Sequence, residues 1–142
     1  MALASRNRRI QEWLGKQYFN AGAYSASPSA GIGYSTGAGG AVTQATSKST
    51  GVTLNNICGV ITMNNAALAD GAEVTFTVTN SAVAATDCVI VNIASVGTAG
   101  AYNISVSAVA SGSFKISVGN VSGGSLSEAI VLNFAVIKGV SA

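Results

Sequence analysis

The segment Glu73-Val-Thr-Phe-Thr-Val-Thr79 alternates strictly between polar and apolar side chains. In an extended chain successive side chains point to opposite sides, so Val74, Phe76 and Val78 would share one face. β-Branched and aromatic residues in this period-two order are typical of a strand with one buried face. The segment therefore predicts a β-strand that packs against an apolar core.

The same alternation recurs on both sides of this segment. It is present at 89–93, 102–106 and 114–118, and strand-like apolar segments lie at 57–63 and 129–137. Turn-forming residues separate these segments, and no convincing helical pattern interrupts them. About seven strands with short connections predict an all-β fold, an antiparallel β-sandwich or jelly-roll-like domain over residues 42–142.

The segment 129–137 is apolar on both of its faces. One face carries Ile130, Leu132, Phe134 and Val136. The other carries Val131, Ala135 and Ile137, and only Asn133 interrupts it. A strand that is apolar on both faces is normally buried on both, so one face needs a cover from outside the domain. We predict that Val131, Ala135 and Ile137 form an oligomer interface, although the pattern leaves open which face points into the core.

Charged residues are rare in this chain. They make up 8% of the sequence, against about 25% in an ordinary soluble domain. Small uncharged residues, which lose little side-chain entropy on burial, take their place. We therefore expect much of the domain surface to be covered by other copies of the chain. The alternative is a secreted domain with a surface rich in Ser and Thr.

Two further segments precede the β-domain. Residues 1–19 predict an N-terminal docking arm that forms an amphipathic helix, because its large apolar residues recur at helical spacing. These residues are Ile10, Trp13, Leu14 and Tyr18. Residues 20–41 are rich in Gly, Ala and Ser, include the only proline and show no periodicity. They predict a flexible linker.

The arm also concentrates positive charge. Arg6, Arg8, Arg9 and Lys16 stand against a single acidic residue, Glu12. Arginine and aromatic side chains often anchor interfaces, so we predict that Arg6, Arg8 and Arg9 dock onto a larger particle together with the apolar stripe. We expect the partner to be protein, not nucleic acid. The alternative is a frayed terminus that only improves solubility.

Several kinds of functional site have no support in the sequence. The chain has no histidine, which removes the commonest general base and the commonest zinc ligand. Cys58 and Cys88 lie in apolar strand-like contexts and predict reduced core residues, with a disulfide between them as the alternative. Asp70 and Glu73 predict solvated turn carboxylates. No segment has the length and apolarity of a membrane span, and no signal-peptide core is visible near the N-terminus. We expect a non-enzymatic protein, made in a cytosol, without cofactor or metal.

Two long segments resemble a known module. The first runs Gly40-Ala-Val-Thr-Gln-Ala-Thr-Ser-Lys-Ser-Thr-Gly-Val-Thr-Leu-Asn55 and continues at Gly59-Val-Ile-Thr-Met-Asn64. The second is the closing run Gly124-Ser-Leu-Ser-Glu-Ala-Ile-Val-Leu-Asn-Phe-Ala-Val-Ile-Lys-Gly139. Together they resemble a β-rich module of tailed-bacteriophage structural proteins, seen in head-decoration and head-fibre proteins and at tail-fibre ends. The resemblance implies a virion location and a trimer.

The expected function is therefore capsid decoration. An oligomer of this chain would stabilise the head by binding the major capsid protein or another virion protein across neighbouring subunits. A short arm, a linker and a compact domain leave no room for a long fibre shaft, which favours the head surface. The alternative is a short tail fibre or host-recognition tip that touches a receptor through the loops at 64–71 or 94–100. A third reading is a carbohydrate-binding or carbohydrate-processing domain, which the scarcity of aromatic residues disfavours.

Overall fold

The computed structural model describes residues 24–29, 31–95 and 97–140. The chain divides into two units, Met1–Gly33 and Tyr34–Ala142, and every strand of the described residues belongs to the second. The predicted docking arm, residues 1–19, lies outside the described residues. Its helix and its docking residues Arg6, Arg8, Arg9, Ile10, Trp13, Leu14 and Tyr18 therefore remain predictions.

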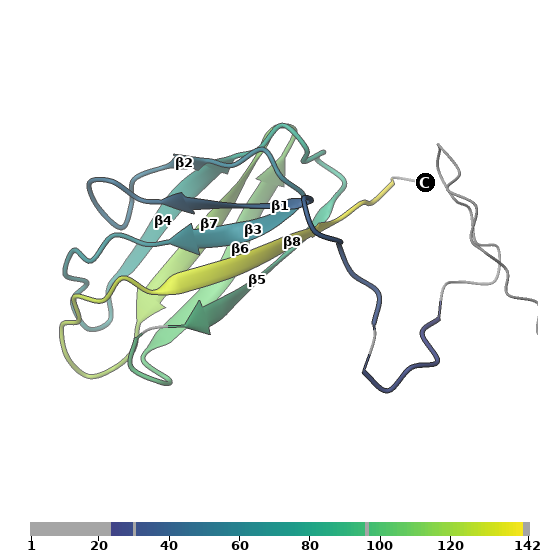
Figure 1. Cartoon of the computed structure of the whole chain (residues 1–142). Coiled ribbons are helices and arrows are strands. Elements are labelled where there is room, and N and C mark those ends of the chain that lie inside the picture. The colour runs from purple at the N-terminus through teal and green to yellow at the C-terminus, as the bar shows by residue number, and fades with distance from the viewer. Residues whose placement is uncertain (1–23, 30, 96, 141–142) are drawn as a thin grey trace, which may run out of the picture. The chain divides into compact units, whose positions relative to one another are not determined.

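The second unit is all-β and contains two four-stranded sheets (Figure 1). Sheet A has the strand order β1-β3-β8-β5, and sheet B has the order β2-β4-β7-β6. The bounds of the strands are β1 Gly39–Thr43, β2 Val52–Thr53, β3 Cys58–Thr62, β4 Glu73–Thr79, β5 Cys88–Ser95, β6 Tyr102–Ala110, β7 Ser113–Asn120 and β8 Val131–Ile137. All six segments that the alternation predicted form strands, with boundaries that differ by a few residues.

The prediction of purely antiparallel sheets is wrong, because both sheets are mixed. β1 pairs with β3 in parallel, and β2 pairs with β4 in parallel, whereas the other pairings are antiparallel. Parallel neighbours need a crossover connection. The chain supplies it by changing sheets at each step from β1 to β4, so that β2 is the crossover for β1 and β3. β1 also begins at Gly39, inside the segment assigned to the linker, where glycines hide the alternation.

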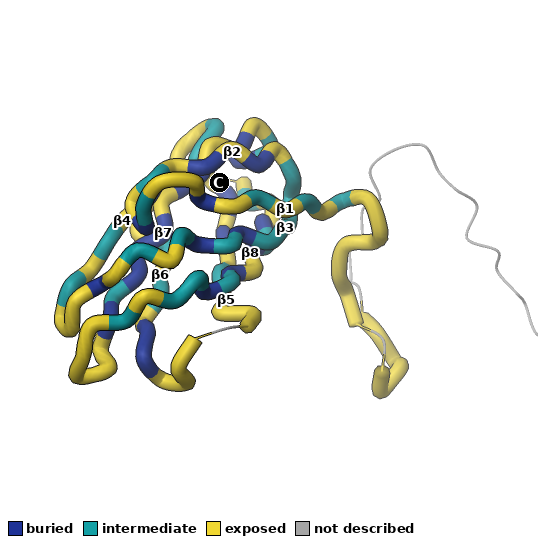
Figure 2. Tube along the Cα trace, turned by 60° about the vertical axis from the view of Figure 1, so that its left-hand side comes forward, coloured by how far each residue is buried: buried dark blue, intermediate teal, exposed yellow. Residues whose placement is uncertain are grey.

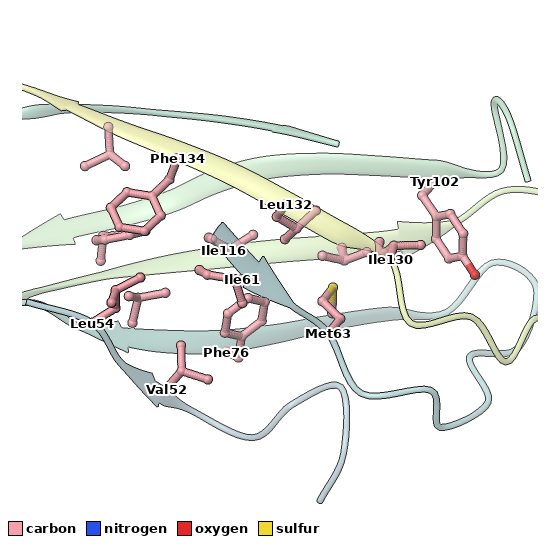
Figure 3. Packing of buried hydrophobic residues seen from close by; sticks show 14 of the residues in the cluster. Val52, Leu54, Ile61, Met63, Phe76, Tyr102, Ile116, Ile130, Leu132 and Phe134 are labelled. Carbon is pink, nitrogen blue, oxygen red and sulfur yellow. The ribbon is translucent and has the colours of Figure 1, made fainter. Parts of the chain in front are cut away.

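The core lies between the two sheets (Figure 3). Sheet B contributes Phe76, Phe114 and Ile116, and sheet A contributes Ile61 and residues of β8. The rings of Phe114 and Phe134, one from each sheet, lie with their centroids 5.2 Å apart. Ile130, Leu132, Phe134 and Val136 are all buried. The face of segment 129–137 that points into the core is therefore settled, and Val131, Ala135 and Ile137 lie on the other face.

The two ends of this unit differ. At one end, here called the base end, the chain runs into β1 and leaves β8 (Figure 1). The hydroxyl of Tyr34 donates a hydrogen bond to the carbonyl of Val136 there, and Thr86 Oγ1 donates one to the carbonyl of Gly139. The connections that follow β1, β3, β5 and β7 lie at the opposite end, here called the loop end.

Candidate interaction surface

The outer face of sheet A carries no charged side chain on its four strands, all of whose residues the structure describes. Its residues follow from the alternation with the buried positions of the same strands (Figure 2). They are Gly39, Ala41 and Thr43 on β1, Cys58, Val60 and Thr62 on β3, Val131, Asn133, Ala135 and Ile137 on β8, and Cys88, Ile90 and Asn92 on β5. An uncharged, mainly apolar sheet face of this kind is typical of an interaction surface.

On this face the two edge strands differ in side-chain size, since one row carries Ile90 at its β5 end and Gly39 at its β1 end. The register places Ile90 beside Ala135, Ala135 beside Cys58, and Cys58 beside Gly39. Ile90 is 44% exposed and Ile137 is 53% exposed. Large apolar side chains therefore project from the β5 side of the face, and this group of Ile90 and Ile137 is here called the ridge.

A shallow hollow lies on the opposite side of the same face. It has a volume of about 300 Å³ and is lined by residues of β1, β3 and β8. Its lining consists of Gly39, Gly40, Cys58, Gly59, Val60, Asn133 and Phe134. Gly39 is the glycine of this lining that lies on the outer face and leaves space there, whereas a Cβ added to Gly40 or Gly59 would point towards Leu54 on the inner side. An added Cβ at Gly59 would come within 2.7 Å of Leu54 and 2.8 Å of the Gly40 carbonyl oxygen, so close packing of β1 on β3 requires glycine there.

The outer face of sheet B has a different chemistry. β4 presents Glu73, Thr75, Thr77 and Thr79, and β7 presents Ser113, Lys115 and Ser117. Thr75 Oγ1 and Ser117 Oγ lie 2.7 Å apart in a hydrogen bond. Hydroxyl groups and charges of both signs suit a hydrated surface. The two sheets therefore differ, and only sheet A exposes a face without charge.

Two charged groups that are close to sheet A lie at its base end. Asp87 accepts a hydrogen bond from Lys138 Nζ at 2.5 Å and one from the amide of Ala84 at 2.8 Å. The Ala84 amide, followed by Lys138, lowers the pKa of Asp87 to about 2. This pair ties the strand exit after β8 to the turn before β5, and it keeps both charges off the sheet face.

The remaining charges near sheet A are at the loop end. Lys48 is only 2% exposed, and its Nζ donates to the carbonyls of Asn64 at 2.7 Å and Glu128 at 2.5 Å. Burial lowers the pKa of Lys48. The Glu128 carboxylate accepts from the amide of Thr98 at 3.0 Å, and this bond contributes most to the lowered pKa of Glu128. Burial raises the pKa of Tyr102 nearby to about 12. These contacts join four loops and serve the fold.

The cysteines are not core residues, contrary to the prediction. Both are free thiols on the outer face of sheet A, where Cys58 is half-buried and Cys88 is exposed. Both cysteines do lie in strands, but their side chains occupy the alternate positions that point outwards. In β5 the buried phase holds Val89 and Val91, which places Cys88 and Ile90 outside.

The structure places the three residues of the predicted oligomer interface on one sheet face, together with several residues that the sequence analysis did not identify. Val131, Ala135 and Ile137 share the outer face of β8. Ile90, Val60 and Ala41 extend this apolar surface across three other strands. The outward position of Ile90 was visible in the alternation of 89–93. The adjacency of the four strands was not, because it depends on the sheet order.

Within the described residues, no group of three or more Cys, Asp or Glu side chains is placed to hold a metal ion. In that same part of the chain no helix has the length and apolarity required to cross a membrane. Comparisons with protein-family models, with curated proteins and with solved structures found no match to this chain.

Proposed function

We propose that this chain is a non-enzymatic virion protein of the capsid-decoration type that works by self-association and docking. The observation that carries the proposal is the uncharged outer face of sheet A, with Ile90 and Ile137 about half exposed. A monomer in water gains nothing from such a face, whereas a neighbouring copy would cover it. The resemblance of residues 40–55, 59–64 and 124–139 to a tailed-bacteriophage module supplies the virion context.

The fold proposed for this role is a β-sandwich. The support is a single core to which both sheets contribute, with Phe114 against Phe134. Sheets that pack face to face in this way bury one side of each strand and present the other side outwards. Such an outward face is available for repeated contacts in a particle, and the resemblance adds the expectation of a trimer.

The docking partner in this proposal is the major capsid protein or another virion protein on the head surface. The N-terminal arm would make the contact through Trp13 and its neighbours, with Arg6, Arg8 and Arg9 guiding the approach. Several weak arms on one oligomer would bind a particle more tightly than a single arm, by a factor of about 10²–10⁴. The protein would then add buried area across neighbouring capsid subunits without any chemistry.

A short tail fibre or host-recognition tip is the second candidate. The described residues of the loops at 64–71 and 94–100 lie at the ends of β3 and β5, at the loop end and away from Tyr34. A tip protein would present such loops to a receptor while its N-terminus joined the tail. Copy number in purified particles separates the two candidates, since a decoration protein is present in far more copies than a tail tip.

The experiment that tests the proposal uses the full chain and a variant that lacks residues 1–20. Each is mixed with particles from which the protein has been stripped, and bound protein is measured after sedimentation of the particles. We expect both proteins to form the same oligomer and only the full chain to bind. Equal binding of the truncated protein would show that the arm has no docking role. A monomeric full chain at micromolar concentration would contradict self-association.

A further inference from the structure

The outer face of sheet A has a shape that fits a second copy of itself. The ridge of Ile90 and Ile137 lies on its β5 side, and the hollow beside Gly39 and Cys58 lies on its β1 side. Neither side carries a charge that would have to be paired. A surface that contains both a projection and a matching depression can pack against an identical surface.

We propose that the outer face of sheet A packs on the same face of a second copy around a two-fold axis parallel to the strands. This geometry rests on the self-association proposed above. A two-fold axis that runs between β3 and β8 places β5 of one copy over β1 of the other, and β8 over β3. The register then sets Ile90 opposite Gly39 of the second copy and Ala135 opposite Cys58.

The direction of the axis follows from the side-chain sizes. An axis perpendicular to the strands would place β5 over β5, so that ridge meets ridge and hollow meets hollow. Such a packing leaves voids, which protein interfaces avoid. Aligned sheets in contact cross at about 30°, which displaces facing positions at the edge strands by only about one residue. The contact between Ile90 and the hollow therefore survives the twist.

The size of the face predicts a reversible contact. Four strands spaced about 4.8 Å apart and roughly 20 Å long give a projected area of about 400 Å² on each copy. Specific interfaces usually bury about 800 Å² on each partner. The face alone is therefore expected to support a dimer whose population depends on protein concentration. This geometry departs from the trimer that the resemblance implies, because a ring of three copies would need two different surfaces on each chain, tilted against each other, and the outer face of sheet A is a single surface.

The parallel axis has a consequence for where the two chains enter their domains. Because the rotation keeps the strand direction, the base ends of both copies point the same way. Tyr34 then lies at the same end in both copies, where its hydroxyl bonds Val136. Both chains would therefore enter their domains from one side of the dimer, and both sets of loops would lie on the other. An axis perpendicular to the strands would place the two entry points on opposite sides.

Two charge variants test this geometry in the full chain. Ile90→Glu places an acid on the ridge, and Gly39→Lys places a base at the hollow, where an added Cβ meets only Cys58, with Sγ at 3.4 Å. Each variant alone should associate at least about 10-fold more weakly than the wild type, because its charge is buried without a partner. An equimolar mixture should recover a heterodimer, since the introduced acid of one copy would face the introduced base of the other only with the parallel axis. Ser105→Glu, on the exposed outer face of β6, is the matched control and should leave association unchanged.

Sedimentation equilibrium separates the outcomes. A wild-type dimer with recovery in the mixture supports the geometry. Three results would overturn the geometry but leave self-association intact. They are a wild type that associates while the mixture stays monomeric, a wild type with the mass of a trimer, and variants that associate like the wild type. A monomeric wild type would overturn both proposals. If a variant fails to fold, alkylation of Cys58 and Cys88 in the wild type tests whether this face is the one covered: both thiols should react more slowly as the associated fraction rises, and unchanged rates would overturn the proposal.

Discussion

The division of β8 into a core face and an outer face can be measured directly. Leu132 is completely buried, so Leu132→Ala should create a cavity and lower the free energy of unfolding by about 2–5 kcal/mol. That loss is a large part of the roughly 5–15 kcal/mol that stabilises an ordinary domain. With a urea m-value of about 1–3 kcal/mol per molar, the unfolding midpoint should fall by about 1 M or more.

Ile137 provides the matched substitution at the end of the same strand. It is 53% exposed in the single chain, so Ile137→Ala removes carbon groups that are only half buried. At about 0.8 kcal/mol for each buried carbon, the loss should be about 1 kcal/mol in the monomer. Ile137→Asp should have a similarly small effect on the monomer but should weaken association strongly, because the charge would enter an interface without a partner.

Urea unfolding followed by far-ultraviolet circular dichroism, at concentrations well below association, gives both numbers. Sedimentation of the same samples at higher concentration then reports assembly. We expect Leu132→Ala to change stability and Ile137→Asp to change assembly. Equal losses of stability for Leu132→Ala and Ile137→Ala would refute the assignment of the two faces, and so would normal association of Ile137→Asp.

Three further predictions concern the arm, the base end and the loop end. Trp13→Ala should weaken attachment of the full chain to stripped particles by about 2 kcal/mol per arm if Trp13 is an interface anchor, while the oligomer mass stays unchanged. The pKa of Asp87, about 2, lies below its ordinary value, so its stabilising contribution is complete above about pH 4 and is lost as the pH falls towards 2. Acid titration of unfolding should show this loss, and Asp87→Asn should remove it. Asn120 is fully buried and its amide donates to the carbonyls of Leu68 at 2.8 Å and Gly124 at 2.7 Å, so Asn120→Ala should cost about 1–3 kcal/mol in a thermal or urea melt.

Much of the fold follows from alternation alone. The segments around Phe76 and Phe114 have β-branched or aromatic residues at every second position, and both form strands whose apolar side chains point inwards. Alternation is a local property, so it identifies a strand and its two faces. It does not say which strands become neighbours, and the parallel pairing of β1 with β3 depends on a crossover through the other sheet.

The candidate surface was likewise only partly predictable from the sequence. The apolar outward residues of β8 were recognised because Val131, Ala135 and Ile137 stand in one short segment. Gly39 and Cys58 were not recognised as part of the surface, since a glycine carries no hydropathy signal and a cysteine is usually buried. They acquire their role only when the register places Cys58 beside Ala135 and Gly39 beside Cys58. The hollow thus depends on the sheet order and on the missing side chain of Gly39.

The proposed pairing of sheet A and the proposed docking of the arm are each weak contacts, and each would strengthen the other on a particle. A face of about 400 Å² is small for a stable interface, and a helix of about 10–13 residues is marginal on its own in water. Neither contact needs to be strong if both act on the same particle. Pairing joins two arms in one dimer, and attachment of the first arm raises the effective concentration of the second. Particle binding would in turn hold two copies close enough for their uncharged faces to meet. Ile90→Glu leaves both arms intact but weakens pairing, so we expect it to lower the affinity of the full chain for particles. The same substitution should have no effect on particle binding in a chain that already cannot pair.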